Sequence, residues 1–203
     1  MPPNPVHDVA VFLTKGDYLA ASNRAFVVAY WILLGIAAVG ALAAWRRDRG
    51  QRGTRALGIL LLRVLTGTMW WEQSLWKIPP HFGGLIYWMK EEVAHAAVPL
   101  QGTLIRVIVL PNISVFGPLV YAIEALIGAS LIVGLFTRLG AILGILMAIN
   151  LWLGLYSAPG EWPWTYFFLI TIMGLYCIDP PGRVLGWDAL RQRAGAGRVG
   201  ILG

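Results

Sequence analysis

The sequence predicts an all-α integral membrane protein, a bundle of about five transmembrane helices. The chain has 203 residues, of which 58% are hydrophobic and only 13% charged. Soluble domains, by contrast, contain roughly 25% charged residues. Apolar runs of about 20 residues, the length that crosses a hydrocarbon core, recur along the chain between short polar or proline-rich segments. Because backbone groups in lipid must be hydrogen-bonded within their own segment, such runs are expected to be helices.

The N-terminal part of the chain contains one such run. Residues 1–24 are polar and proline-containing and are expected to lie outside the membrane, whereas residues 25–45 form the first predicted span. Five arginines follow within the ten residues 46–55. Lys and Arg accumulate in cytoplasmic loops, so this loop is predicted to be cytoplasmic and the N-terminus outside.

The remaining chain is predicted to be one membrane domain, residues 56–178, followed by a basic cytoplasmic tail, residues 179–203. An outside loop, residues 79–111, interrupts the domain after Pro79-Pro80, because proline cannot continue a helix. Within this loop, mixed apolar and charged positions at helical spacing predict a short helix at the membrane surface. The predicted spans of the domain are residues 56–78, 113–136, 139–156 and 164–178.

Charge and cysteine content exclude several classes of function. The net charge is +6, but the cations stand at the ends of apolar runs, where the positive-inside rule explains them without nucleic acid. The single cysteine, Cys177, excludes an internal disulfide and a multi-cysteine metal centre. We therefore expect no nucleic-acid partner and no metal. The predicted location is the cell inner membrane, with the C-terminus cytoplasmic.

Two charged residues within predicted spans are the candidate catalytic residues. Glu124 stands near the middle of the third span, and a carboxylate in lipid usually faces a partner or a cavity. Arg63 in the second span comes within about 9 Å of it in depth, counting the helical rise per residue. We predict that the two side chains pair. The alternatives are that Arg63 extends to the interface and that Glu124 only organises helix packing.

Aromatic and basic residues near the outer ends of the spans suggest a binding site. Trp70, Trp71 and Trp162 could form the walls of a pocket for a flat quinone headgroup, with Lys77 and His81 as a positive rim. The alternative for the tryptophans is an ordinary interfacial belt. No nucleotide-binding, haem or serine-hydrolase motif is present in the sequence. Any electron-transfer cofactor would therefore be bound without a motif or be supplied by another subunit, and quinone is the candidate.

Two stretches of the chain resemble the DoxX/DoxD family of membrane proteins. Residues 63–77 are similar to its R-x-x-x-G … G-x-x-K motif, although Glu-Gln-Ser stands where the family has a second small residue. Residues 124–141 are similar to the more specific E-x-x-x-G … G-L-x-T-R-x-x-A motif. Residues 159–166, PGEWPWTY, look most like the DoxD branch. The resemblance implies a four-helix core, to which residues 25–45 add an N-terminal span.

The resemblance also implies a function. The DoxD branch is associated with thiosulfate:quinone oxidoreductase, in which a small membrane subunit works with a second subunit to oxidise thiosulfate and reduce quinone. This implies a membrane subunit of a quinone-linked redox enzyme, in a lipid bilayer and with other membrane-protein subunits. The alternative is a non-catalytic accessory subunit of a larger respiratory or photosynthetic complex.

Overall fold

The computed structural model describes residues 24–193, together with positions 4, 6, 7 and 11. Most of the predicted outside segment 1–24 and the last ten residues of the predicted tail, 194–203, lie outside the described residues. Helices and turns make up the described part of the chain, which contains no strand. The all-α prediction is confirmed.

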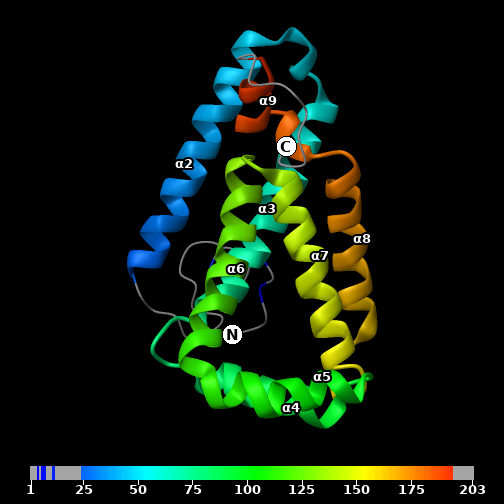
Figure 1. Ribbon diagram of the computed structural model, residues 1–203. Coiled ribbons are helices and arrows are strands. Elements are labelled where there is room, and N and C mark those ends of the chain that lie inside the picture. The colour runs from blue at the N-terminus through cyan, green and yellow to red at the C-terminus, as the bar shows by residue number, and fades with distance from the viewer. Residues whose placement is uncertain (1–3, 5, 8–10, 12–23, 194–203) are drawn as a thin grey trace.

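Five long helices form the frame of the molecule (Figure 1). Their bounds are α2 Arg24–Arg47, α3 Thr54–Leu75, α6 Ile113–Val133, α7 Thr137–Gly154 and α8 Pro163–Ile178. Each corresponds to one predicted span, and successive helices run in opposite directions. Shorter elements join them: η2 Arg49–Gln51, α4 Gly83–His95, α5 Pro99–Leu104, the π-turn η3 Ile105–Val109, η4 Leu110–Asn112, η5 Pro181–Arg183 and α9 Trp187–Arg193.

Three helical stretches in the described residues are long and apolar enough to cross a membrane: Ala25–Arg47, Pro99–Val133 and Thr137–Gly154. The second is bent, because α5 lies across the end of the bundle before α6 enters it (Figure 1). Helix α8 is apolar but shorter, and α3 contains Arg63 and Glu72. The protein is therefore an integral membrane bundle in which α3 is the polar member.

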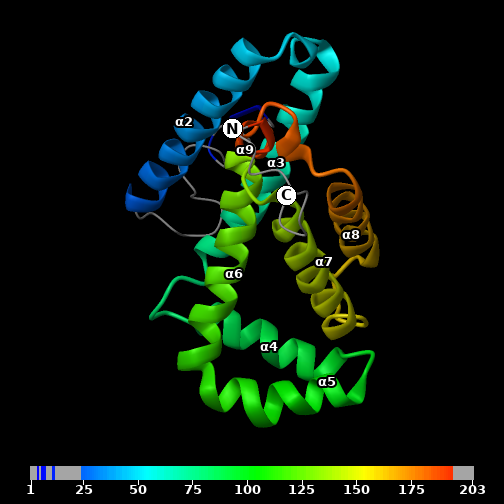
Figure 2. The ribbon, with the colours of Figure 1, turned by 45° about the horizontal axis from the view of Figure 1, so that its top comes forward.

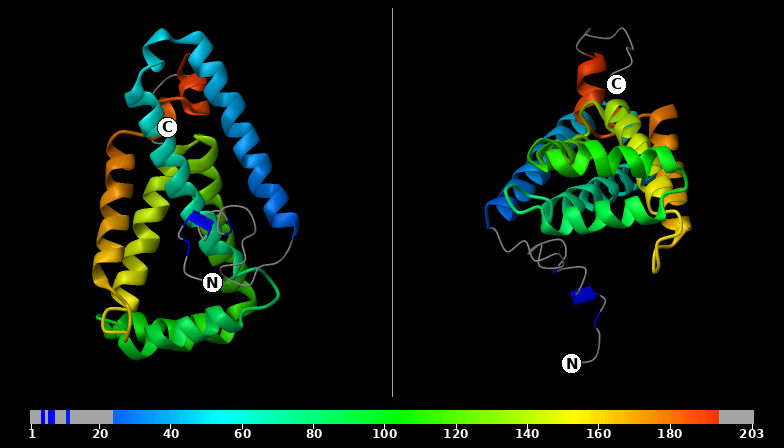
Figure 3. Two further views of the ribbon diagram at one scale, coloured as in Figure 1. Left: turned by 180° about the vertical axis from the view of Figure 1, so that it is seen from behind. Right: turned by 60° about the horizontal axis from the view of Figure 1, so that its bottom comes forward.

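Helix α4 and the segment α5–η3 cover one end of the bundle. Figures 2 and 3 show them side by side and transverse to the long helices. Leu85 and Met89 of α4 pack on Ile105 of η3 in a shared apolar cluster. The short helix predicted in the outside loop is thus present, and it lies against the bundle through an apolar face.

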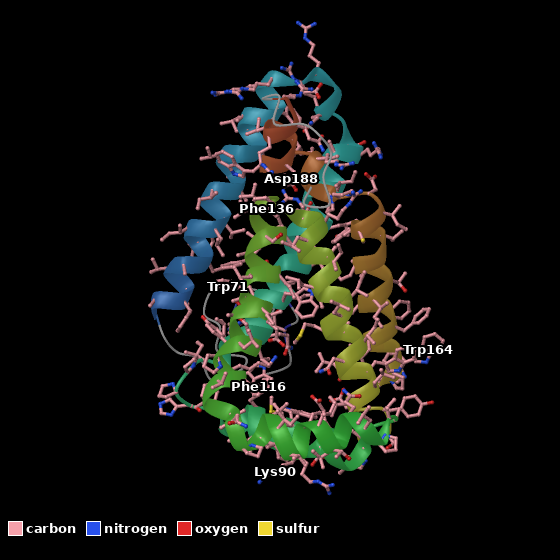
Figure 4. The ribbon with its side chains drawn as sticks, viewed as in Figure 1. Trp71, Lys90, Phe116, Phe136, Trp164 and Asp188 are labelled. Atoms are coloured by element: carbon pink, nitrogen blue, oxygen red, sulfur yellow. The ribbon has the colours of Figure 1, made fainter. Side chains whose placement is uncertain are left out.

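The opposite end is formed by the arginine-rich loop and α9. The carboxylate of Asp188 in α9 accepts hydrogen bonds from the backbone N–H of Phe136 at 2.9 Å and of Thr137 at 3.0 Å. These N–H groups begin α7 and have no partner within the helix, so the carboxylate acts as its N-terminal cap. Figure 4 shows Phe136 and Asp188 together at this end. Residues 181–193, predicted to belong to a basic tail, instead fold back and close the bundle.

Helices α3 and α6 cross in backbone contact. A Cβ atom added to Gly67 would lie 2.7 Å from the backbone nitrogen of Ile132, and one added to Gly128 would lie 2.7 Å from that of Trp71. Small residues permit this approach between membrane helices. The crossing brings the polar face of α3 against α6, so polar groups from the two helices meet inside the bundle.

Candidate functional site

A buried ion pair joins the end of α3 to the middle of α6. The ammonium group of Lys77 donates a hydrogen bond to Oε1 of Glu124 at 2.6 Å and also contacts Oε2. Only 5% of the Lys77 surface and 1% of the Glu124 surface are exposed. Helix α3 ends at Leu75, and the turn that follows directs the Lys77 side chain back into the bundle. Glu124 therefore has a charged partner inside the bundle, as an acid at this depth requires.

The predicted pairing of Glu124 with Arg63 is wrong. Arg63 is completely buried, and its guanidinium group donates to the carbonyl oxygen of Ile132 at 2.9 Å and to that of Leu185 at 3.1 Å. A further bond from Nη1 goes to the carbonyl of Leu131. The last carbonyls of a helix have no partner within it, and a cation there is also favoured by the helix dipole. Arg63 thus caps the C-terminal end of α6 and ties it to residue 185.

A third charged residue, Glu92 of α4, lies close to this ion pair. Only 7% of its surface is exposed, and its charge interacts with that of Lys77. A Cβ on Gly154 of α7 would lie 2.8 Å from Oε2 of Glu92, so the carboxyl group is packed against that helix. Burial raises the pKa of Glu92 from the ordinary 4.5 to about 7, and the positive charge of Lys77 partly opposes this rise.

The sequence analysis did not identify Glu92, although a signal was present. The buried residues of α4 are Leu85, Met89 and Glu92. Their spacing of four and three residues places all three on one helix face. In an amphipathic helix, an acidic residue is not expected on the same face as two large apolar residues. The position of Glu92 on that face could therefore have identified it as a candidate.

The predicted tryptophan pocket is not formed as expected. Trp70 packs with Ile127 and Met173 on the side of α7 and α8, whereas Trp71 packs with Tyr30 on the side of α2. The two rings therefore pack against different helices. Each is buried, and the indole N–H of each finds no hydrogen-bond acceptor among the described residues.

The predicted positive rim is not formed either. Lys77 is buried and pairs with Glu124, whereas His81 is exposed. Trp162 is also on the surface, with 65% of its area exposed. Of the predicted site residues, the structure brings Lys77 and Glu124 into direct contact. Trp70 belongs to the same bundle interior, through Ile127 on α6.

Comparison with known proteins supports the resemblance found in the sequence. Residues 58–157 match the model of the DoxX family. Searches of curated proteins and of solved structures gave no match. The matched segment contains Lys77, Glu92 and Glu124, so the whole polar cluster lies within it. Residues 58–157 are therefore a domain of the DoxX family of membrane proteins.

Proposed function

We propose that this protein is the membrane subunit of a quinone-linked redox enzyme, and that the Lys77–Glu124 pair is the polar end of its quinone site. The observation that supports this best is the ion pair itself, held inside a largely apolar bundle. A buried ion pair is costly to desolvate and is a poor source of stability. Ionisable residues inside membrane proteins mark binding sites and proton paths more often than they serve packing.

The chemistry of the pair suits a quinone. A quinone carbonyl oxygen accepts a hydrogen bond, and the ammonium group of Lys77 is a charged donor, which makes such bonds strong. Reduction to the quinol adds two electrons and two protons, one proton to each oxygen. Glu124 is close enough to Lys77 to exchange a proton with it. The catalytic role of Arg63 is not proposed again, because its donors are engaged by backbone carbonyls.

The candidate electron donor is thiosulfate, which the likeness of residues 159–166 to the DoxD branch suggests. Two thiosulfate ions form one sulfur–sulfur bond, giving tetrathionate and releasing two electrons, which reduce the quinone. We expect a partner subunit to bind thiosulfate and the inner membrane to hold the assembly, with the arginine-rich end in the cytoplasm.

The proposal can be tested with purified protein and with membranes. Binding of a short-chain ubiquinone is measured by the quenching of tryptophan fluorescence in the native protein, in Glu124→Gln and in Glu91→Gln. Glu91 is the matched control, because it lies on the surface of α4 beside His95. We expect Glu124→Gln to weaken binding about tenfold or more, because Lys77 then lacks the carboxylate that keeps it charged and holds its ammonium group in place for the quinone oxygen. Membranes containing this variant should lose thiosulfate-dependent quinone reduction.

The opposite result would favour an accessory subunit. If the native protein binds no ubiquinone, and Glu124→Gln membranes retain full activity, the ion pair has only a structural role. Purification within a larger complex that contains no quinone would agree with that result.

A further inference from the structure

We propose that Glu92 is the carboxyl group through which the quinone site exchanges protons with the aqueous phase at the α4 end of the bundle. This inference rests on the proposed function. It adds to that function the residue Glu92 and the end of the bundle at which protons are exchanged. In its protonated form Glu92 donates a hydrogen bond to a quinone oxygen beside Lys77. When two electrons arrive from the sulfur donor, the Glu92 O–H bond breaks and its proton bonds to one quinone oxygen. The other quinone oxygen takes the second proton from the aqueous phase, and the Glu92 carboxylate is reprotonated from the same phase.

The position of Glu92 differs from that of a surface acid. Its side chain is buried on the inner face of α4, against Gly154, and its carboxyl group makes no hydrogen bond with the described residues. The neighbouring Glu91 is half-buried and forms an ion pair with His95 at 3.4 Å. A buried carboxyl without a bonding partner is costly, so a ligand that accepts its hydrogen bond would remove part of that cost.

The charged groups around Glu92 are few. Lys77 interacts with it from the end of α3, and Tyr166 interacts with it from α8. Helix α5 contains no ionisable side chain, and the one in α7, Arg138, is at the opposite end of that helix. On η3 the one cation, Arg106, is exposed. Within α4, Lys90 is exposed and points away from the bundle (Figure 4).

Two further polar groups, Tyr166 and Glu161, lie at the α4 end of the bundle, and Tyr166 interacts electrostatically with Glu92. The hydroxyl group of Tyr166 donates to Oε2 of Glu161 at 2.6 Å, and Glu161 lies in the turn before α8. This turn is at the same end of the bundle as α4 (Figure 1). In the proposed scheme, protons reach the site at this end through Glu92 and do not cross the apolar length of the bundle.

The protonation of Glu92 is balanced near neutral pH. With a pKa of about 7, both forms are populated under ordinary conditions, as an acid that must give and regain a proton requires. The protonated form donates to a quinone oxygen, whereas the ionised form would face the lone pairs of that oxygen. Quinone affinity should therefore be high below the pKa and fall as the pH rises through it.

The test compares Glu92→Gln with Glu91→Gln in purified full-length protein. The dissociation constant of a short-chain ubiquinone is measured by fluorescence quenching from about pH 5.5 to pH 8.5, a range that brackets the Glu92 pKa. In the native protein and in Glu91→Gln we expect affinity to fall about three- to tenfold across this range, the value of one hydrogen bond. Glu92→Gln should bind at every pH as tightly as the native protein does at low pH, because the amide always donates.

The outcomes separate this inference from the function on which it rests. If the native protein binds ubiquinone and Glu92→Gln shows the same pH dependence, the role of Glu92 is refuted and the quinone site stands. If Glu92→Gln removes the pH dependence while Glu91→Gln keeps it, the role is supported. If no variant binds ubiquinone at any pH, both the function and the inference fail.

Discussion

Lys77 and Glu124 are removed from water on all sides, and this burial determines the energetics of the pair. Their attraction is strong in a low-dielectric interior, but both groups lost their hydration to form it. The two terms nearly cancel when both charges are present. They do not cancel when one charge is removed, because the other then remains buried without a partner.

We predict strong coupling between these two residues. Lys77→Met or Glu124→Leu alone should lower the free energy of unfolding by about 3–5 kcal/mol, whereas the double variant should lose much less than the sum. Thermal unfolding in detergent at fixed pH measures the three variants. The double variant should be stable but should not bind ubiquinone, which separates the functional role from the structural one. Additive losses would contradict a direct interaction.

At the scale of the elements, the contact between α3 and α6 positions the site. Gly67 and Gly128 face each other across this contact, and each would place a Cβ against backbone of the other helix. Backbone cannot move aside as a flexible side chain can. A shift of α6 by a fraction of an ångström would also change the distance between Lys77 and Glu124, since Glu124 lies on α6 and Lys77 lies in the turn directly after α3.

We predict that Gly128→Ala destabilises the bundle by about 1–3 kcal/mol through overpacking, despite the higher helix propensity of alanine. Gly58→Ala is the matched control on α3, because a Cβ there meets nothing within 4 Å. It should leave the unfolding temperature unchanged or raise it slightly. Equal effects of the two substitutions would show that α3 and α6 do not make the close contact.

At the scale of the whole molecule, the charges are distributed unequally between the two ends. One end contains the arginines of the loop after α2 and those of η5 and α9. The opposite end contains few arginines and has the acidic residues Glu91, Glu92 and Glu161. Because membranes retain Lys and Arg on the cytoplasmic side, this asymmetry predicts that α4 lies outside.

We predict this orientation in a form that labelling can measure. In a Cys177→Ser background, which has no other cysteine, Lys90→Cys should react with a membrane-impermeant maleimide in intact cells. Arg49→Cys should react only after the cells are permeabilised. Both native side chains are exposed, so access to the reagent should depend on the side of the membrane alone. The reverse pattern would invert the orientation and the direction of proton exchange at Glu92.

Much of the fold could be predicted from local patterns. The lengths of the apolar runs agree with the five long helices, and Pro79-Pro80 does mark a break after α3. The fold-back of residues 181–193 could not be predicted, because the buried Asp188 caps a helix about fifty residues earlier in the chain. A carboxylate that caps a distant helix has no local signature, and in the sequence this segment differs little from a basic tail.

The sequence by itself determined the class of the protein, the number and approximate limits of its long helices, and the need for Glu124 to have a partner. These follow from hydropathy, length and the cost of a charge in lipid, which are properties of single segments. Only the tertiary structure decided that the partner is Lys77, that Arg63 caps α6, and that Glu92 joins the site from a transverse helix. The depth of a residue in the membrane follows from its place along one helix and can be read from the sequence. Which charges pair depends on how the helices rotate and cross. In this protein, the contact between Gly67 and Gly128 determines that geometry.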